Sequence, residues 1–213
     1  AATGIVQAAF GFQGQKCSAC SRLIVDEKVH DELVEKVVAL TKKLKVGQPT
    51  EGDTNVSAVI NKRSFDNTLR YIDTSVAEGG VVLTGGKGDD STGYFVEPTI
   101  VDNVAPGATL EQEEVFSFVL AVIKARNYDH AIEIANDTEF GLTGAVYSAS
   151  QERLDQARRD FHVGNLYLNR KCTGALVGVH PFGGFNMSGT DSKAGGREYL
   201  LQFMQGKSIA QKI

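Results

Sequence analysis

A cysteine in a glycine-containing turn is the residue of this sequence best suited to nucleophilic chemistry. Cys17 follows Gly14-Gln15-Lys16, between a helix-like opening stretch and an apolar, strand-like run. A free thiol is only a few per cent ionised at neutral pH, so a catalytic cysteine needs hydrogen-bond donors or positive charge beside it. Lys16 and the backbone N–H groups of the turn can supply both. Most cysteines are simply small buried side chains, so the turn alone does not separate a nucleophile from a packed residue.

The other reactive residue types form weaker patterns. Cys20 lies three residues after Cys17, which invites a redox-pair interpretation, but a turn before a strand is not the helix N-terminus that such pairs use, so packing is favoured. Cys172 receives no role. His180 either lines a pocket entrance or is structural, and the four histidines are too scattered for a zinc site. We therefore expect no metal.

Composition narrows the class of protein. The 213 residues carry 22 Lys and Arg against 26 Asp and Glu, a formal net charge of −4, which gives no positive field for a nucleic-acid partner. No apolar run approaches the roughly 20 residues that span a bilayer, so no membrane association is expected. Three cysteines are too few and odd in number for a disulfide framework, which suits a reducing compartment. We expect a cytoplasmic α/β protein.

The elements that must position Cys17 alternate between strand-like and helix-like patterns. Apolar residues at helical spacing predict helices over 29–44, 65–76, 128–136 and 150–161. Short apolar runs predict strands at 22–25, 81–84, 95–101, 118–124 and 165–168. Such alternation is typical of a largely parallel sheet covered by helices. Residues 207–213 alternate polar and apolar side chains, as an edge strand that pairs with another subunit would.

Four blocks, in order along the chain, resemble the aldehyde dehydrogenase superfamily. The first is its active-site signature, represented by Gly14, Gln15, Cys17, Ala19 and Arg22. Phe10 starts one residue too early, and Phe12 too late, for the phenylalanine of that signature. The others are Glu113-Glu114-Val115-Phe116, the run 136–143 from Asn136 to Thr143, and Pro181-Phe182-Gly183-Gly184 followed by Ser188-Gly189.

The resemblance implies a catalytic Cys17 and a nicotinamide cofactor. Its thiolate attacks an aldehyde, hydride passes to NAD, and water activated by a glutamate base hydrolyses the thioester. Glu114 would hold the nicotinamide ribose hydroxyls, and Phe116 would pack beside the nicotinamide. Where the family usually continues with Gly-Pro, this sequence has Ser117-Phe118, so the nicotinamide pocket is expected to differ in shape.

Within the superfamily the sequence is most similar to the 1-pyrroline-5-carboxylate dehydrogenases, also called glutamate semialdehyde dehydrogenases. The likeness is carried by residues 17–22, 164–169 and 173–184. It implies that Ser18, Gly174 and Ala175 anchor the α-carboxylate of the substrate and that Phe182 walls its aliphatic part. A hydroxyl and free backbone N–H groups can solvate an anion.

The resemblance also indicates a fragment of a longer enzyme. The glutamate base, the side-chain amide of the oxyanion site and a Gly-x-Gly-x-x-Gly cofactor unit are not found here, so an NAD-binding domain is expected upstream and absent. The residues that discriminate NAD from NADP would belong to it. We interpret 1–206 as the catalytic, thiol-bearing domain and 207–213 as a terminal strand for oligomerisation, and expect a homo-oligomer.

Three other functions stay open. One is a dehydrogenase for another carboxylated aldehyde, such as succinate semialdehyde. The second is a non-catalytic homologue kept as a scaffold, against which the intact Cys17 turn argues. The third is a thiol-disulfide protein that uses Cys17 and Cys20.

The 213-residue chain on its own is predicted to have no dehydrogenase activity, because the expected base and cofactor domain lie outside it. The measurement is NADH absorbance after adding glutamate semialdehyde and NAD to the purified chain. Any turnover above a Cys17→Ser control would contradict the prediction.

Overall fold

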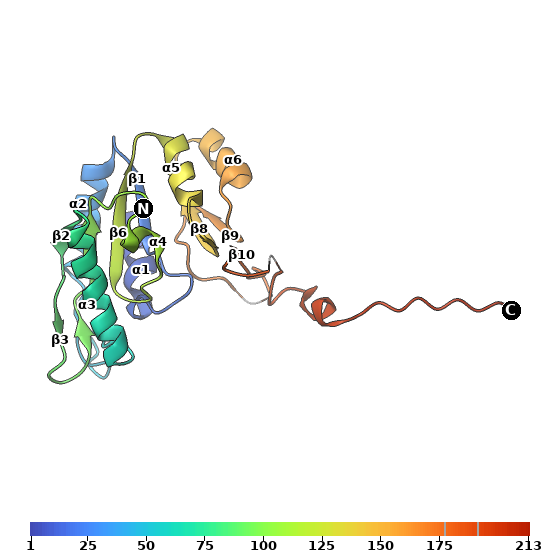
Figure 1. Cartoon of the computed structure of the whole chain (residues 1–213), viewed down its shortest axis with the longest axis horizontal. Coiled ribbons are helices and arrows are strands. Elements are labelled where there is room, and N and C mark those ends of the chain that lie inside the picture. Colours follow the sequence, from blue (N-terminus) through green and yellow to red (C-terminus); the bar gives the residue numbers. More distant parts are fainter. Residues whose placement is uncertain (177, 191) are drawn as a thin grey trace.

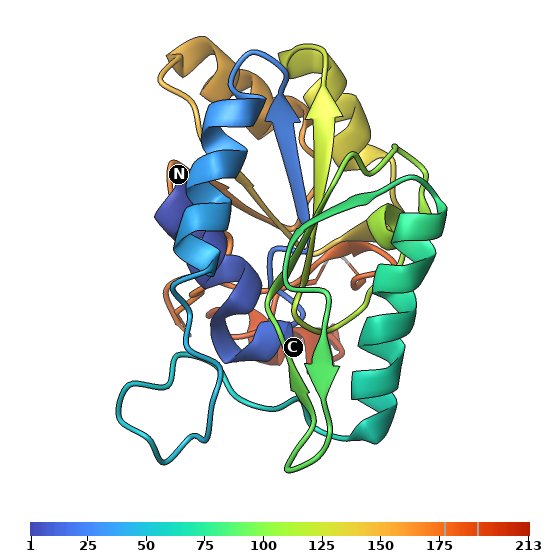
Figure 2. The same cartoon turned by 90° about the vertical axis from the view of Figure 1, so that its left-hand side faces the viewer.

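A four-stranded sheet lies at the centre of the protein (Figures 1 and 2), whose computed structural model describes residues 1–176, 178–190 and 192–213. Its order is β1 (Arg22–Asp26), β6 (Val119–Ala125), β5 (Thr99–Asp102) and β2 (Val81–Thr84). β6 pairs parallel with both β1 and β5, whereas β2 joins β5 antiparallel. The expected α/β fold with a largely parallel sheet is confirmed.

Side chains of β6 alternate between two apolar cores, one on each face of the sheet. Leu120 and Val122 pack with residues of α1 (Ala2–Phe10) and α2 (His30–Thr41). The intervening Val119, Ala121 and Ile123 pack instead with residues of α3 (Lys62–Ala77), α4 (Thr109–Gln112) and α5 (Tyr128–Asn136). Because successive strand residues point to opposite faces, a strand buried on both faces is apolar throughout.

A smaller unit follows α5 and carries the second half of the candidate site. β8 (Thr143–Val146) pairs parallel with β9 (Asn165–Leu168), and α6 (Gln151–Asp160) connects them. β7 (Phe140–Gly141) pairs antiparallel with β10 (Phe185–Asn186). Two 3-10 turns, η1 (Gly11–Gly14) and η2 (Tyr199–Phe203), precede the cysteine turn and the chain end.

Most element predictions agree with the structure, and side-chain caps explain the sharpest boundaries. Asn127 accepts a hydrogen bond from the backbone N–H of His130 at 2.9 Å, and α5 begins at the next residue, Tyr128. The strand expected at 95–101 is divided, because Pro98 has no N–H for a ladder. Its first part, β4 (Phe95–Val96), pairs with β3 (Gly88–Asp89) rather than with the central sheet.

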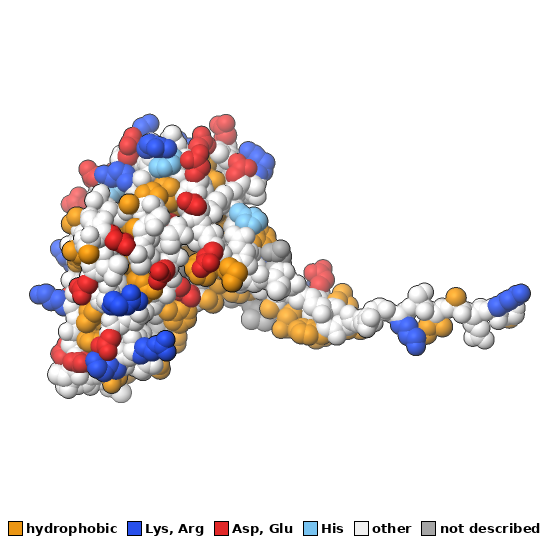
Figure 3. All heavy atoms as spheres, viewed as in Figure 1, with side chains coloured by type: hydrophobic (Ala, Val, Ile, Leu, Met, Phe, Trp, Pro, Cys, Tyr) orange, Lys and Arg blue, Asp and Glu red, His pale blue; other side chains and the backbone are white. Residues whose placement is uncertain are grey.

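The last ten residues extend away from the body of the protein (Figure 1). Residues 204–213 pair with no other described segment, so the predicted role of 207–213 as a strand between subunits stays a prediction. On the face drawn in Figure 3, acidic and basic side chains are interspersed over the body. Among the described residues no helix is long and apolar enough to span a membrane.

The turn before Cys17 is fixed by a close backbone contact. Gly14 has φ +66°, and a Cβ there would lie 2.3 Å from the carbonyl oxygen of Ser117. Only glycine fits both the conformation and the space. The η1 turn therefore rests directly on the segment that leads into β6.

Replacing Gly14 with Ala should lower the free energy of unfolding by about 2 kcal/mol or more, because the new methyl group meets backbone in a left-handed conformation. Urea denaturation of the variant measures this. Gly107→Ala is the matched control, since Gly107 also has positive φ but nothing within 4 Å of an added Cβ. An equal loss in both variants would show that the conformation, rather than the contact with Ser117, is what matters.

Candidate active site

The cysteine turn presents its thiol to solvent. The backbone N–H of Ala19 donates to the carbonyl of Lys16 at 3.0 Å, which closes a turn with Cys17 and Ser18 at its centre. Cys17 is exposed, whereas Cys20 is half-buried and Cys172 is buried. The sequence expectation that this turn exposes a reactive side chain agrees with the structure.

Residues 17–21 alternate between two sides of the turn. Cys17, Ala19 and Ser21 line a pocket of about 280 Å³, whereas Ser18 and Cys20 are not part of its lining. The carbonyl of Ser18 accepts a weak hydrogen bond from the thiol of Cys172 at 3.5 Å. Cys17 therefore lies at the border between the pocket and the segment that follows β9.

Glu114, expected from the resemblance to hold the ribose hydroxyls, lines the same pocket as Cys17. Its carboxylate is exposed and hydrogen-bonds to none of the residues that the structure describes. The neighbouring Glu113 also lines the pocket but accepts a hydrogen bond from the hydroxyl of Tyr71 at 2.5 Å, and this bond raises the pKa of Tyr71. Of the two acidic residues, Glu114 is the one whose oxygens face no described donor.

Phe116 and Ser117 show how the sequence departs from the family pattern. Phe116 has φ +58°, is 45% exposed and is not among the pocket-lining residues, so its contact with a nicotinamide stays a prediction. Ser117 is buried against Gly14, and its hydroxyl has no hydrogen-bond partner among the described residues. A glycine here, as in the family pattern, would avoid that buried polar group.

The predicted carboxylate anchors lie after β9. Gly174 has φ +92° and is exposed, and Ala175 follows it half-buried. Their backbone N–H groups donate to none of the described residues. The contact between Cys172 and Ser18 brings this loop beside the cysteine turn.

Phe182 lies in a separate segment that several hydrogen bonds hold in place. Its backbone pairs with Ala194 through two hydrogen bonds of 2.9 and 2.8 Å. The side chain of Asn165 holds both neighbours, accepting from the N–H of Gly183 at 3.1 Å and donating to the carbonyl of Pro181 at 2.9 Å. Phe182 is half-buried and does not line the pocket that contains Cys17.

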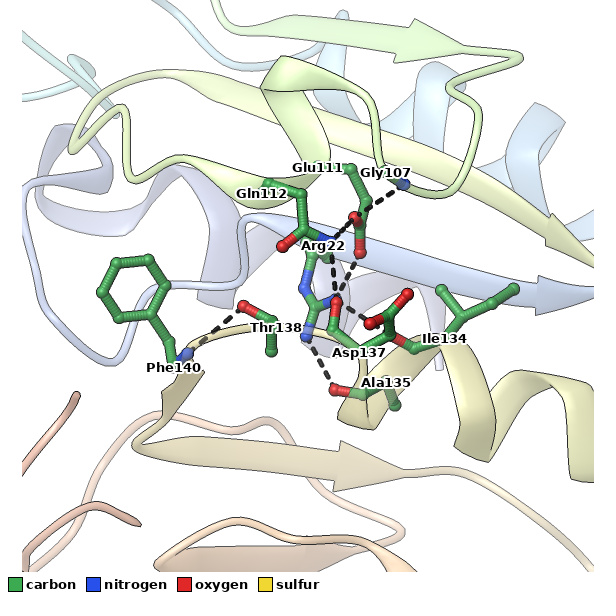
Figure 4. A network of polar contacts seen from close by, with 9 residues as sticks. All are labelled: Arg22, Gly107, Glu111, Gln112, Ile134, Ala135, Asp137, Thr138 and Phe140. Atoms are coloured by element: carbon green, nitrogen blue, oxygen red, sulfur yellow. Dashed lines mark hydrogen bonds and ion pairs between the residues drawn. The ribbon is translucent and has the colours of Figure 1, made fainter. Parts of the chain in front are cut away.

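A buried ion pair forms one wall of the pocket (Figure 4). The guanidinium of Arg22, the first residue of β1, lies 2.5 Å from the carboxylate of Glu111, which is almost fully buried. Arg22 also donates to the carbonyls of Ile134 at 3.1 Å and Ala135 at 2.9 Å, near the end of α5. The side chain of Gln112 donates to both Glu111 and the carbonyl of Asp137. One cation thus holds β1, α4 and the end of α5 together.

Glu111 and Gln112 were not predicted from the sequence as parts of the site. Arg22 was expected only as the last position of the cysteine signature. Nothing in the local pattern identifies Glu111, because its partner is far away in the sequence and a single acidic residue in a short helix is ordinarily solvated. Ser188 was quoted as part of a motif without a role, and here its hydroxyl accepts from the N–H of Gly141 at 3.0 Å in the pocket wall.

The positive charge of Lys16 acts on the buried thiol of Cys172. Burial lowers the pKa of Lys16, and the nearby positive charge of Lys171 lowers it further. The interaction of Lys16 with a thiol is with Cys172, whose pKa its charge helps to lower. Within the described residues no group of three or more His, Cys, Asp or Glu could hold a metal ion.

Comparison with known proteins gives consistent matches over the whole chain. Residues 1–209 match the aldehyde dehydrogenase family. Curated relatives named 1-pyrroline-5-carboxylate dehydrogenase, from Anoxybacillus flavithermus and from Bacillus subtilis, are each 55% identical over 211 residues. Each match covers 99% of this chain but only 41% of the relative, so the chain spans about two fifths of the relatives' length.

Solved structures give the same result. A 1-pyrroline-5-carboxylate dehydrogenase from Thermus with bound NAD superposes with a TM-score of 0.95 at 47% identity, covering 100% of this chain and 41% of that one. Aldehyde dehydrogenase 21 from Physcomitrella patens, in complex with the reaction product succinate, superposes with a TM-score of 0.82 at 30% identity. The match covers 90% of this chain and 38% of the aldehyde dehydrogenase 21 chain.

Replacing Glu111 with Ala should lower the free energy of unfolding by about 3 kcal/mol, because it leaves the guanidinium of Arg22 largely buried without its counter-charge. Thermal or urea denaturation measures the loss. Glu114→Ala is the matched control from the same segment and should leave stability unchanged, since Glu114 is exposed and has no described partner. Equal stability of the Glu111 variant and the wild type would contradict the structural role of the pair.

Proposed function

The chain belongs to the aldehyde dehydrogenase family, and we propose that the protein that carries it oxidises glutamate 5-semialdehyde, the open form of 1-pyrroline-5-carboxylate, to glutamate with NAD. The relatives of this name, 55% identical over almost the whole chain, support the substrate. The NAD-bound Thermus structure supports the cofactor. Such an activity belongs to proline or arginine degradation.

The proposal rests on the exposed thiol of Cys17, which has the pocket on one side and the loop after β9 on the other. On one side it shares a pocket with Glu114. On the other side Ser18 adjoins the loop with the backbone N–H groups of Gly174 and Ala175, which donate to none of the residues that the structure describes. A reacting aldehyde at the sulfur would have a hydride acceptor on one side and a carboxylate-binding surface on the other.

Cys17 acts as the nucleophile in this proposal. Its thiolate attacks the aldehyde carbon and forms a thiohemiacetal, whose oxyanion the backbone N–H of Cys17 can stabilise. Loss of hydride leaves a thioester, which water hydrolyses to the carboxylic acid and the free thiol. When bound, NAD supplies the acceptor for that hydride.

The residues around the pocket fit part of a dinucleotide. Two carboxylate oxygens of Glu114, which no described donor occupies, can accept hydrogen bonds from the two ribose hydroxyls. A volume of about 280 Å³ is near the lower end of small-molecule sites, so the pocket suits a nicotinamide riboside rather than a whole dinucleotide. Phe116 is proposed to pack beside the nicotinamide.

The α-carboxylate is proposed to bind between the cysteine turn and the loop after β9. The Ser18 hydroxyl and the backbone N–H groups of Gly174 and Ala175 can each donate to it, and the positive φ of Gly174 turns the main chain at that point. Phe182 would cover the aliphatic part of the substrate. Backbone donors suit this role because they cannot be titrated or rotated away.

The arrangement of the whole protein is also part of the proposal. Residues 1–206 would form the catalytic domain, and 207–213 would pair with a second subunit of a homo-oligomer. The cofactor domain would be supplied by the part of the relatives that this chain does not cover.

Succinate semialdehyde is the alternative substrate, favoured by the likeness to aldehyde dehydrogenase 21 bound to succinate. Both substrates carry a carboxylate, but only glutamate semialdehyde has an α-amino group beside it. A scaffold role is less well supported, because a protein without chemistry has no need to expose a thiol in a pocket.

The test is kcat/KM for the two semialdehydes on the protein that carries this chain, with the glutamate compound expected to be preferred. Ser18→Ala should raise KM for glutamate semialdehyde on the order of tenfold, the loss of one hydrogen bond to a charged group, and leave propanal oxidation nearly unchanged. Ser91→Ala, in the exposed β3–β4 turn, is the control. A preference for succinate semialdehyde would replace the proposed substrate, and unchanged kinetics of Ser18→Ala would remove Ser18 from the anchor.

A further inference from the structure

Two cysteines that the proposed mechanism does not use lie together behind the cysteine turn. Cys172, after β9, is buried with Ala8 of α1 and Tyr167 of β9, and Cys20 packs against the same cluster. The backbone N–H of Cys20 donates to the carbonyl of Ala8 at 3.2 Å, which fixes its position against α1. The alternation of residues 17–21 is what turns Cys20 away from Cys17 and towards Cys172.

Contacts to the backbone bring the two sulfur atoms near each other. The thiol of Cys172 donates to the carbonyl of Ser18 at 3.5 Å, which places its sulfur beside the stretch that carries Cys20. The thiol of Cys20 donates to the carbonyl of Arg22 at 3.6 Å. Each thiol is close enough to shift the pKa of the other.

The surroundings make the two thiols unequal. Hydrogen bonds from Cys20 and from the hydroxyl of Thr143, with the positive charge of Lys16, lower the pKa of Cys172 despite its burial. The hydrogen bond with Cys172 and burial raise the pKa of Cys20 well above its ordinary value. A thiol of lowered pKa beside one of raised pKa is the arrangement expected of an attacking and a resolving cysteine.

We propose that Cys20 and Cys172 form an oxidation site, which hydrogen peroxide converts to a disulfide. The thiolate of Cys172 attacks one peroxide oxygen, the O–O bond breaks, and the departing hydroxide leaves as water after taking up a proton. The resulting sulfenic acid is attacked by Cys20, so that the S–S bond forms as the S–O bond breaks and a second water leaves. Two thiols lose two electrons and two protons, and one peroxide is reduced to two waters.

The bond would join the cysteine turn to the loop that carries Gly174 and Ala175. Cys20 is only three residues from Cys17, and Cys172 only two from Gly174. The oxidised protein would thus have the nucleophile and the proposed carboxylate anchor in one covalent unit. The inference itself does not depend on the proposed function, because it rests on two residues outside that mechanism.

The experiment uses a Cys17→Ser variant of the protein that carries this chain. Trypsin cleaves after Lys16, Arg22, Lys171 and Lys193, so residues 17–22 and 172–193 are released as separate peptides. With Cys17 replaced, the first peptide holds Cys20 as its only thiol. After treatment with hydrogen peroxide and alkylation, mass spectrometry without reductant should find the two peptides joined, lighter by two hydrogens than their sum.

Control variants distinguish specific oxidation of the Cys20–Cys172 pair from nonspecific oxidation of cysteines. The linked peptide should be absent from Cys17→Ser variants that also carry Cys20→Ser or Cys172→Ser. It should form about tenfold or more faster in folded protein than in urea, because the fold holds the thiols together. Sulfinic or sulfonic acid on either cysteine without the linked peptide, or equal rates in folded and unfolded protein, would overturn the proposal. If the double variants fail to fold, the rate of linked-peptide formation in folded and in urea-treated Cys17→Ser protein tests the proposal without them.

Discussion

The guanidinium of Arg22 is the constraint on which the candidate site depends. It lies at the start of β1, directly after the cysteine turn, and holds both the buried carboxylate of Glu111 and two carbonyls near the end of α5. A cation is favoured at the C-terminal end of a helix, where unpaired carbonyls gather. The pair therefore joins three segments, distant in the sequence, that line one pocket, and neither charge can leave without exposing the other to an apolar interior.

Alternation in the short stretch 17–21 gives the site its two sides. Cys17, Ala19 and Ser21 line the pocket, while Ser18 and Cys20 lie on the side of Cys172, in the segment after β9. In the proposed function, a single stretch would thus serve a cofactor on one side and a substrate carboxylate on the other. The same arrangement places Cys20 against the cluster that contains Cys172, whereas Cys17 lines the pocket.

The sequence predicted the parts of the fold that local patterns determine. Helix α5 was located from its apolar spacing, and β1 and β9 from short apolar runs. β7 and β10 were missed because two-residue strands have no periodicity, and Pro98 divided a run that looked continuous. Cys17 and Glu114 followed from a resemblance, whereas the partnership of Glu111 with Arg22 could not be predicted, since tertiary packing alone joins them.

The contact between Gly14 and Ser117 has a consequence for the entropy of the reaction. The main chain before the sulfur packs directly against the carbonyl of Ser117, three residues after Glu114, so this contact helps to set how the two segments lie relative to each other. In the proposed function, a bound nicotinamide riboside would then meet a sulfur whose main-chain position the fold has already set. Part of the entropy that a reaction between two separate molecules must lose would then already have been lost when the protein folded.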